Sequence, residues 1–122
     1  MEVQRLTIKD LMVGDWVEID NEFTDVVRIY RDEIGTFCMD EFPISKVSPI
    51  PITTEILEKN GINRRGNGCE YMSFEKGYNI LFIASNKMFH IHNERCFNGH
   101  LKYVHELQHA LRLCGIDKEI VL

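Results

Sequence analysis

The chain has 122 residues, of which 44% are hydrophobic and 27% charged, and its formal net charge is −5. This is the composition of a globular protein, long enough to bury a core without help from a metal or a disulfide. The acidic balance argues against broad non-specific binding to nucleic acid or to an anionic membrane surface.

The first residues, Met1–Arg5, are polar, and no long apolar run follows them. Neither an export signal nor a transmembrane span is therefore predicted. The four cysteines form no C-x-x-C pair and are expected to be reduced thiols. We expect a cytoplasmic protein with no cofactor and no membrane attachment.

The first part of the chain alternates short apolar stretches with turn residues, which is typical of a small curled β-sheet of the SH3-like kind. The predicted turns are Gly14-Asp15, Asp20–Glu22 and Glu33–Gly35. The predicted extended segments are Leu6–Ile8, Trp16–Ile19, Thr24–Tyr30 and Thr36–Met39.

Prolines make Ile44–Ile52 an extended connector, and a short helix is predicted after it. Thr53 is suited to cap the start of this helix, and Asn60-Gly61 is suited to end it with Ile62 folded back. Asn63–Gly68 has no apolar residue and is predicted to be a loop.

Three strands are predicted next, at Tyr71–Phe74, Tyr78–Ala84 and Lys87–His92. The second is apolar on both faces and should be the central strand of an antiparallel meander. After a loop at Asn93–Gly99, apolar residues at helical spacing predict a long helix over Leu101–Gly115. The predicted class is α+β, with subdomains at residues 1–47 and 48–122 that together form one compact unit.

The long helix contains His105-Glu106-Leu107-Gln108-His109, which matches the H-E-x-x-H pattern. In zinc hydrolases with this pattern the two histidines hold the metal, and the glutamate is the general base. One hypothesis is therefore a hydrolase that uses His105, His109 and Glu106, with a third metal ligand from His90, His92 or His100.

A helical wheel centred on Leu107 favours a different interpretation, because it places His105 and His109 on the outward face of the helix. Lys102 and Arg112 share that face and would repel a metal ion. On this interpretation Glu106 is an exposed charge that contributes only tenths of a kcal/mol, roughly, to stability.

Two further groups of residues have both a functional and a structural interpretation. His90 and His92 lie on one face of a predicted strand. They can be metal ligands, or they can simply belong to the exposed face of a half-buried sheet. Arg64-Arg65 lies in a glycine-flanked loop, where it can hold a phosphate or simply be solvated. No interleaved aromatic residues mark a stacking platform, so nucleic-acid binding is not expected.

Trp16, Tyr30 and Phe37 form the third such group. In an SH3-like sheet they can line an aromatic groove for a peptide, or they can belong to the core of so small a sheet.

Three stretches carry a resemblance to a known family. They are Leu11-Met12-Val13-Gly14-Asp15-Trp16-Val17, then Pro49-Ile50-Pro51-Ile52-Thr53-Thr54-Glu55-Ile56-Leu57-Glu58-Lys59-Asn60-Gly61, then Lys102-Tyr103-Val104-His105-Glu106-Leu107-Gln108. In this order the chain resembles a family of short, uncharacterised bacterial and prophage-associated proteins. Asn is common in that family at the position of His109, which implies that the zinc pattern belongs to this member alone. The resemblance assigns no catalytic residue, and it directs attention to the surface around Tyr103, His105 and Gln108.

Three functional hypotheses follow. The first is a non-enzymatic interaction or structural module of phage or mobile-element origin, with a protein partner that contacts Tyr103, His105, Gln108, Trp16 and Tyr30. The second is the zinc hydrolase, and the third is nucleic-acid binding through Arg64 and Arg65.

Overall fold

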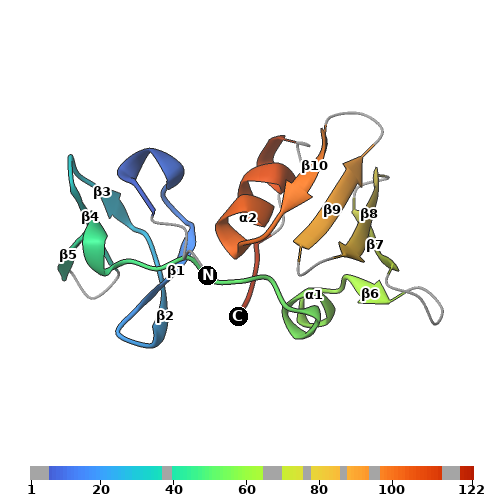
Figure 1. The fold of residues 1–122 in the computed structure, drawn as a ribbon, viewed down its shortest axis with the longest axis horizontal. Helices are drawn as coiled ribbons and strands as arrows, with labels where there is room; N and C mark the ends of the chain where they lie inside the picture. The colour runs from blue at the N-terminus through green and yellow to red at the C-terminus, as the bar shows by residue number, and fades with distance from the viewer. Residues whose placement is uncertain are drawn as a thin grey trace. The chain divides into compact units, whose positions relative to one another are not determined.

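A computed structural model describes residues 6–36, 40–64, 70–75, 78–85, 88–93, 97–113 and 119–122 (Figure 1). Between residues 64 and 99 it describes the strands by their backbone pairing. The chain is of mixed α+β class with antiparallel strands. It divides into two compact units, residues 1–50 and residues 51–122, which are taken in turn below.

The described part of the first unit consists of short strands and 3-10 turns. The bounds are η1 (Ile8–Asp10), β1 (Trp16–Ile19), β2 (Glu22–Asp25), β3 (Arg28–Ile29), β4 (Glu33–Gly35), β5 (Glu41–Pro43) and η2 (Ile44–Lys46). Strands β1 and β2 pair with each other, and β3, β4 and β5 pair in that order. The core consists of Leu6, Leu11, Val17, Ile19, Val26, Ile34 and Val47.

The β1–β2 hairpin follows the predicted turn closely. Asp20 and Asn21 form its two-residue loop with φ angles of 51° and 65°. A right-handed twisted hairpin favours such a loop, and Asp and Asn tolerate positive φ better than most residues. The predicted strand at Trp16–Ile19 is confirmed, and so is the turn at Asp20-Asn21, whereas Glu22, also predicted in the turn, begins β2.

The single strand predicted over Thr24–Tyr30 is wrong, because the chain changes partner in its middle. The N–H of Val26 donates to the carbonyl of Asp15 at 2.8 Å, whereas the N–H of Val27 donates to the carbonyl of Gly35 at 2.8 Å. β2 therefore ends before Val26, and β3 begins beside β4. A run of β-forming residues predicts extended backbone, but not this change of neighbour.

Three other predictions in the first unit differ from the structure. Leu6–Ile8 leads into the turn η1, because Thr7 N–H donates to the Asp10 carboxylate at 2.8 Å. The predicted turn Glu33–Gly35 is instead the central strand β4, whose Ile34 is fully buried. Of the strand predicted at Thr36–Met39, Thr36 lies outside any strand, and the other three positions lie outside the described residues.

The second unit combines an antiparallel sheet with two helices. Its elements are α1 (Thr54–Lys59), β6 (Asn63–Arg64), β7 (Glu70–Glu75), β8 (Tyr78–Ser85), β9 (Met88–Asn93), β10 (Phe97–Leu101) and α2 (Val104–Leu113). The strand order is β10-β9-β8-β7-β6, so the predicted central strand is confirmed as β8 (Figure 1).

Two boundaries in this unit differ from the prediction. Asn93–Gly99 was predicted to be a loop, but Phe97–Leu101 is strand β10, paired with β9. The helix predicted from Leu101 begins at Val104, because Leu101 is the last residue of that strand. Of the loop predicted at Asn63–Gly68, the first two residues form β6 and the rest lie outside the described residues, as does Gly115.

The short helix α1 confirms its predicted caps. Thr53 Oγ1 accepts from Ile56 N–H at 3.2 Å, and Gly61 has a φ of 80° that lets Ile62 N–H reach the carbonyl of Leu57 at 2.9 Å.

Asn60 also joins α1 to the end of the chain. Its Nδ2 donates to the carbonyl of Val121 at 2.8 Å, and its Oδ1 accepts from Val121 N–H at 2.7 Å. Asn60 is buried, so this pair of bonds satisfies a side chain that is removed from water.

Candidate functional site

Helix α2 is held at its N-terminus by Glu106. The helix begins at Val104, so Tyr103 occupies the N-cap position. One carboxylate oxygen of Glu106 accepts from Tyr103 N–H at 2.9 Å and from Lys102 N–H at 3.0 Å. Backbone N–H groups at a helix start lack partners within the helix and form the positive end of its dipole. Glu106 is therefore the capping residue of α2, not the loosely exposed charge that the wheel predicted.

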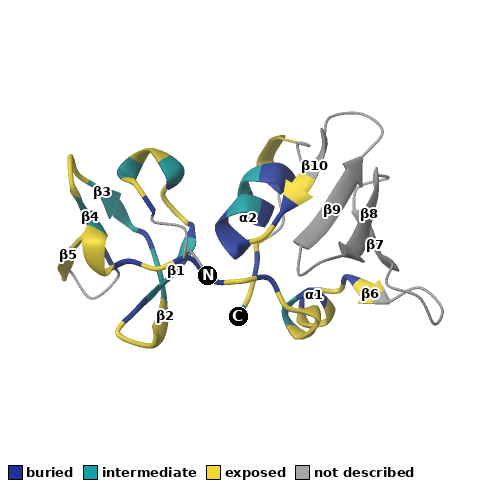
Figure 2. Ribbon diagram, in the orientation of Figure 1, coloured by how far each residue is buried: buried dark blue, intermediate teal, exposed yellow. Residues whose placement is uncertain are grey.

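The predicted outward position of His105 is wrong. Only 3% of its surface is exposed, and Tyr103 and Gln108 are almost as deeply buried (Figure 2). The three residues expected to offer an interaction surface on this helix are thus covered. The buried side of α2 comprises Val104, His105, Leu107, Gln108, Ala110 and Leu111.

The rings at the start of α2 lie beside one another in a series. The Tyr103 and His105 rings are stacked, with centroids 6.0 Å apart and an interplanar angle of 11°. His105 and His109 meet edge to face at 5.7 Å, and Lys102 Nζ lies 5.3 Å from the centre of the Tyr103 ring. These are favourable packing geometries for aromatic rings and for a cation over a ring.

The H-E-x-x-H residues thus have structural roles that differ from those of a zinc hydrolase. A general base needs a carboxylate that can reach metal-bound water, whereas the Glu106 oxygen is engaged with two backbone amides. Among the side chains that the structure describes, no group of three or more His, Cys, Asp or Glu is placed to hold a metal ion.

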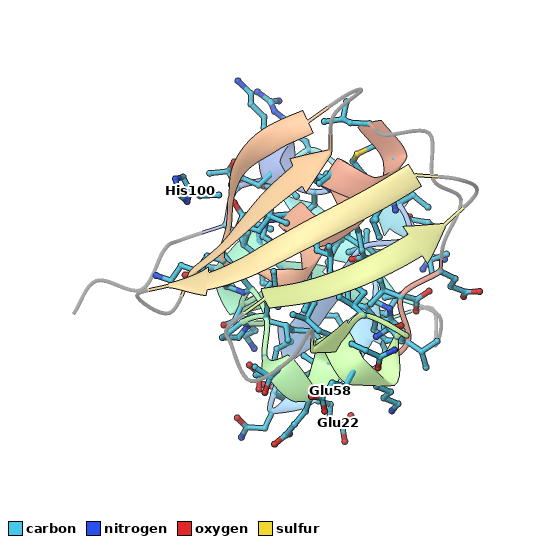
Figure 3. All side chains as sticks on the ribbon, turned by 90° about the vertical axis from the view of Figure 1, so that its right-hand side faces the viewer. Glu22, Glu58 and His100 are labelled. Atoms are coloured by element: carbon cyan, nitrogen blue, oxygen red, sulfur yellow. The ribbon has the colours of Figure 1, made fainter. Side chains whose placement is uncertain are left out.

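The other histidines are related by strand register. His90 and His92 are in β9, as predicted, and His90 is paired with His100 of β10. The sequence analysis did not predict this pairing, because it assigned Asn93–Gly99 to a loop and expected no strand there. Figure 3 shows the His100 side chain pointing away from the strands, and the side chains of His90 and His92 lie outside the described ones.

The aromatic and basic candidates are described only in part. Trp16 is a half-buried residue of β1, and Tyr30 follows β3 with 43% of its surface exposed. Phe37 and Arg65 lie outside the described residues, and Arg64 is placed by its backbone at the end of β6.

The negative charge of the chain is concentrated in the first unit. Residues 1–50 carry 11 acidic and 5 basic side chains, a formal charge of −6, whereas residues 51–122 carry 8 acidic and 9 basic side chains, a formal charge of +1. A positively charged partner would therefore be attracted to the first unit, and any attraction of an anion falls on the second.

The first unit also contains an open hollow of about 150 Å³ that the sequence analysis did not predict. Its lining combines three acidic side chains, two threonines and two apolar side chains, from β1, β2, β5 and positions beside these strands. They are Ile19, Asp20, Glu22, Thr24, Thr36, Asp40 and Phe42. The sequence signal was the density of acidic residues between positions 15 and 41, but their convergence depends on strand pairing.

Comparison of the chain with protein-family models, with curated proteins and with solved structures gave no match. Neither helix in the described part of the chain has the length and apolar character needed to cross a membrane.

Proposed function

We propose that the chain is a non-catalytic module that recognises a positively charged segment of another protein, and that its first unit makes the contact. The observation that carries this proposal is the hollow, which acidic and apolar side chains line together. Sites that bind small groups typically combine apolar lining with a few placed polar groups. The charge of −6 on this unit adds long-range attraction for a cationic partner.

The second unit also favours a non-catalytic role. Its strongest catalytic candidate, Glu106, has a capping role, and His105 is buried. The zinc hydrolase is the second candidate function, since His105 and His109 still lie near each other.

An SH3-like arrangement of the first unit belongs to this proposal. Its support is the change of partner at Val26–Val27, which joins two small antiparallel sheets through one corner. Origin in a phage or mobile element and a cytoplasmic location remain predictions from the sequence.

The test uses three fluorescent peptides of equal length and apolar content, one basic, one neutral and one acidic, with the full chain. Fluorescence anisotropy should show saturable binding of the basic peptide alone, weakening as salt is added. Equal binding of all three peptides, or none of the basic one, would overturn the proposal. Mass spectrometry of the same samples with added zinc tests the alternative, because cleavage that Glu106→Gln abolishes would establish the hydrolase.

A further inference from the structure

Strand β2 is the outer strand of the β1–β2 hairpin (Figure 1). On the other side of β1 lies Ser48, and Glu18 exchanges two backbone hydrogen bonds with it, each of 2.9 Å. The N–H and C=O of one strand residue point to the same side, so those of Glu18 point away from β2. Glu18 and Phe23 are therefore opposite each other without hydrogen bonds, and the N–H and C=O of Phe23 point away from β1.

Asp25 presents its backbone groups to the same open side. Its neighbour Val26 points the other way, because Val26 N–H donates to the carbonyl of Asp15 at 2.8 Å and the Val26 carbonyl accepts from Gly14 N–H at 2.7 Å. Successive residues of a strand alternate in this direction, so Asp25 and Phe23 point outward together. On this side, no hydrogen bond joins the backbone of either residue to any part of the chain that the structure describes. β2 therefore has an unpaired edge.

The unpaired edge ends at Val27, whose N–H donates to the carbonyl of Gly35 at 2.8 Å and begins the pairing with β4. Proteins usually protect an exposed edge with Pro, Lys or a bulge, because another chain can add to it. β2 has the sequence Glu-Phe-Thr-Asp, with neither Pro nor Lys, and the Phe23 side chain is 52% exposed. Its two acidic side chains repel a strand of like charge and attract a basic one.

We propose that an extended, basic segment of the protein partner adds to β2 as an antiparallel strand, an inference that rests on the function proposed above. The N–H and C=O of Phe23 and of Asp25 would pair with the segment, and this main-chain pairing supplies affinity. Alternate side chains supply specificity, because an apolar residue opposite Phe23 and a Lys or Arg opposite Asp25 would share one face. A second basic residue would lie opposite Glu22 on the other face.

A second copy of the chain suits this edge less well than a basic segment does. Two β2 strands side by side would bring the acidic residues of one copy, Glu22 and Asp25, near those of the other, and like charges across a strand pair are destabilising. The formal charge of −6 on each first unit adds repulsion between the copies. A basic segment turns both effects into attraction.

The experiment uses the full chain and a capped peptide with the core Arg-Thr-Val-Lys between threonines. In antiparallel register the arginine lies opposite Asp25, the valine opposite Phe23 and the lysine opposite Glu22. The amides of the arginine and the valine then point to β2, whereas the amides of the central threonine and the lysine point away. N-methylation of the valine removes a donor that faces β2. N-methylation of the central threonine is the matched control, with the same charge and composition.

In ¹H–¹⁵N NMR titrations the unmodified peptide should bind saturably and shift the amides of Phe23 and Asp25. In the free chain these two amides should exchange with solvent faster than those of Thr24 and Val26, and they should slow on binding, because only then do they gain acceptors. N-methylation of the valine should weaken binding about tenfold or more, since a hydrogen bond is lost and the methyl group meets β2. N-methylation of the central threonine should weaken it less than about threefold.

Two variants test the charge on the edge. Asp25→Asn should weaken the unmodified peptide about two- to fivefold, the effect of losing one solvent-accessible charge pair. Asp32→Asn is the matched control, because Asp32 is exposed between β3 and β4 and lies outside β2. Both variants remove one negative charge from the first unit, so a greater loss for Asp25→Asn locates the contact at β2.

The outcomes separate this inference from the proposed function. Binding that both N-methylated peptides retain, or that both lose, would overturn the added strand and leave the basic-partner module standing. Failure of this peptide has the same meaning if the basic peptide of the anisotropy test binds, and failure of both peptides removes both proposals. A dimer in sedimentation velocity, with Phe23 and Asp25 amides that shift with protein concentration alone, would assign the edge to a second copy and overturn the inference.

Discussion

Glu106 shows how one side chain can match a catalytic pattern and have a different task. Its position in H-E-x-x-H is also the third position of α2, from which a glutamate reaches back to the N-cap amide. The observed hydrogen bonds to the Glu106 carboxylate, at 2.9 and 3.0 Å, are those of a helix cap. The same spacing along a helix therefore satisfies both patterns, and only the hydrogen-bond partners distinguish them.

Glu106→Ala should lower the free energy of unfolding by about 1–2 kcal/mol, the usual cost of losing a cap. Glu106→Gln keeps an oxygen acceptor and should cost about half as much or less. Urea melts of the full chain measure both values. An alanine variant as stable as the parent would contradict the capping role.

At the scale of the element, α2 is covered over a wider arc than its apolar residues occupy. His105 and Gln108 are buried beside the apolar stripe, whereas Arg112 and Leu113 are exposed. A hydrophobic stripe predicts which side of a helix faces the core, but not how much of the remainder is enclosed. This is why the wheel placed Leu107 correctly and His105 wrongly.

Leu107 and Leu113 allow a matched test within this helix. Leu107 is fully buried, so Leu107→Ala should cost about 2–5 kcal/mol through lost burial and a cavity. Leu113 is 65% exposed, and Leu113→Ala should stay within about 0.5 kcal/mol of the parent. Denaturant melts that show equal losses would mean that the helix is rotated from its described orientation.

At the scale of the whole molecule, the distribution of charge argues against binding of an anionic polymer such as nucleic acid. The first unit carries −6 and the second +1, so an anionic polymer is repelled by one unit and hardly attracted by the other. Strong nucleic-acid binding needs several close Lys or Arg contacts to phosphate. Arg64-Arg65 is one adjacent pair and would have to act without a wider basic field.

We therefore expect no binding to short single-stranded or duplex oligonucleotides tighter than roughly 10⁻⁶ M at physiological salt. Fluorescence anisotropy measures this, with the basic peptide as the control that the protein sample is competent to bind. Sub-micromolar affinity that disappears in the Arg64→Ala, Arg65→Ala double variant would contradict the expectation and favour the nucleic-acid hypothesis.

Features that depend on neighbouring residues were determined by the sequence alone. Thr53 and Gly61 delimit α1, Asp20-Asn21 turns the first hairpin, and the apolar β8 lies at the centre of its sheet. For the helix ends and the hairpin turn the physical cause is local, either a backbone preference or a side chain that reaches three residues along the chain. For β8 the signal was its apolar residues at successive positions, which a strand with neighbours on both sides requires.

Only the tertiary structure decided what depends on distant partners. It divided Thr24–Tyr30 between two sheets, added β10 where a loop was predicted, and buried His105. It also brought Glu22 and Asp40, which are distant in the sequence, to the lining of one hollow. Strand pairing and enclosure are set by segments far apart in the chain, so periodicity in a single segment carries no record of them.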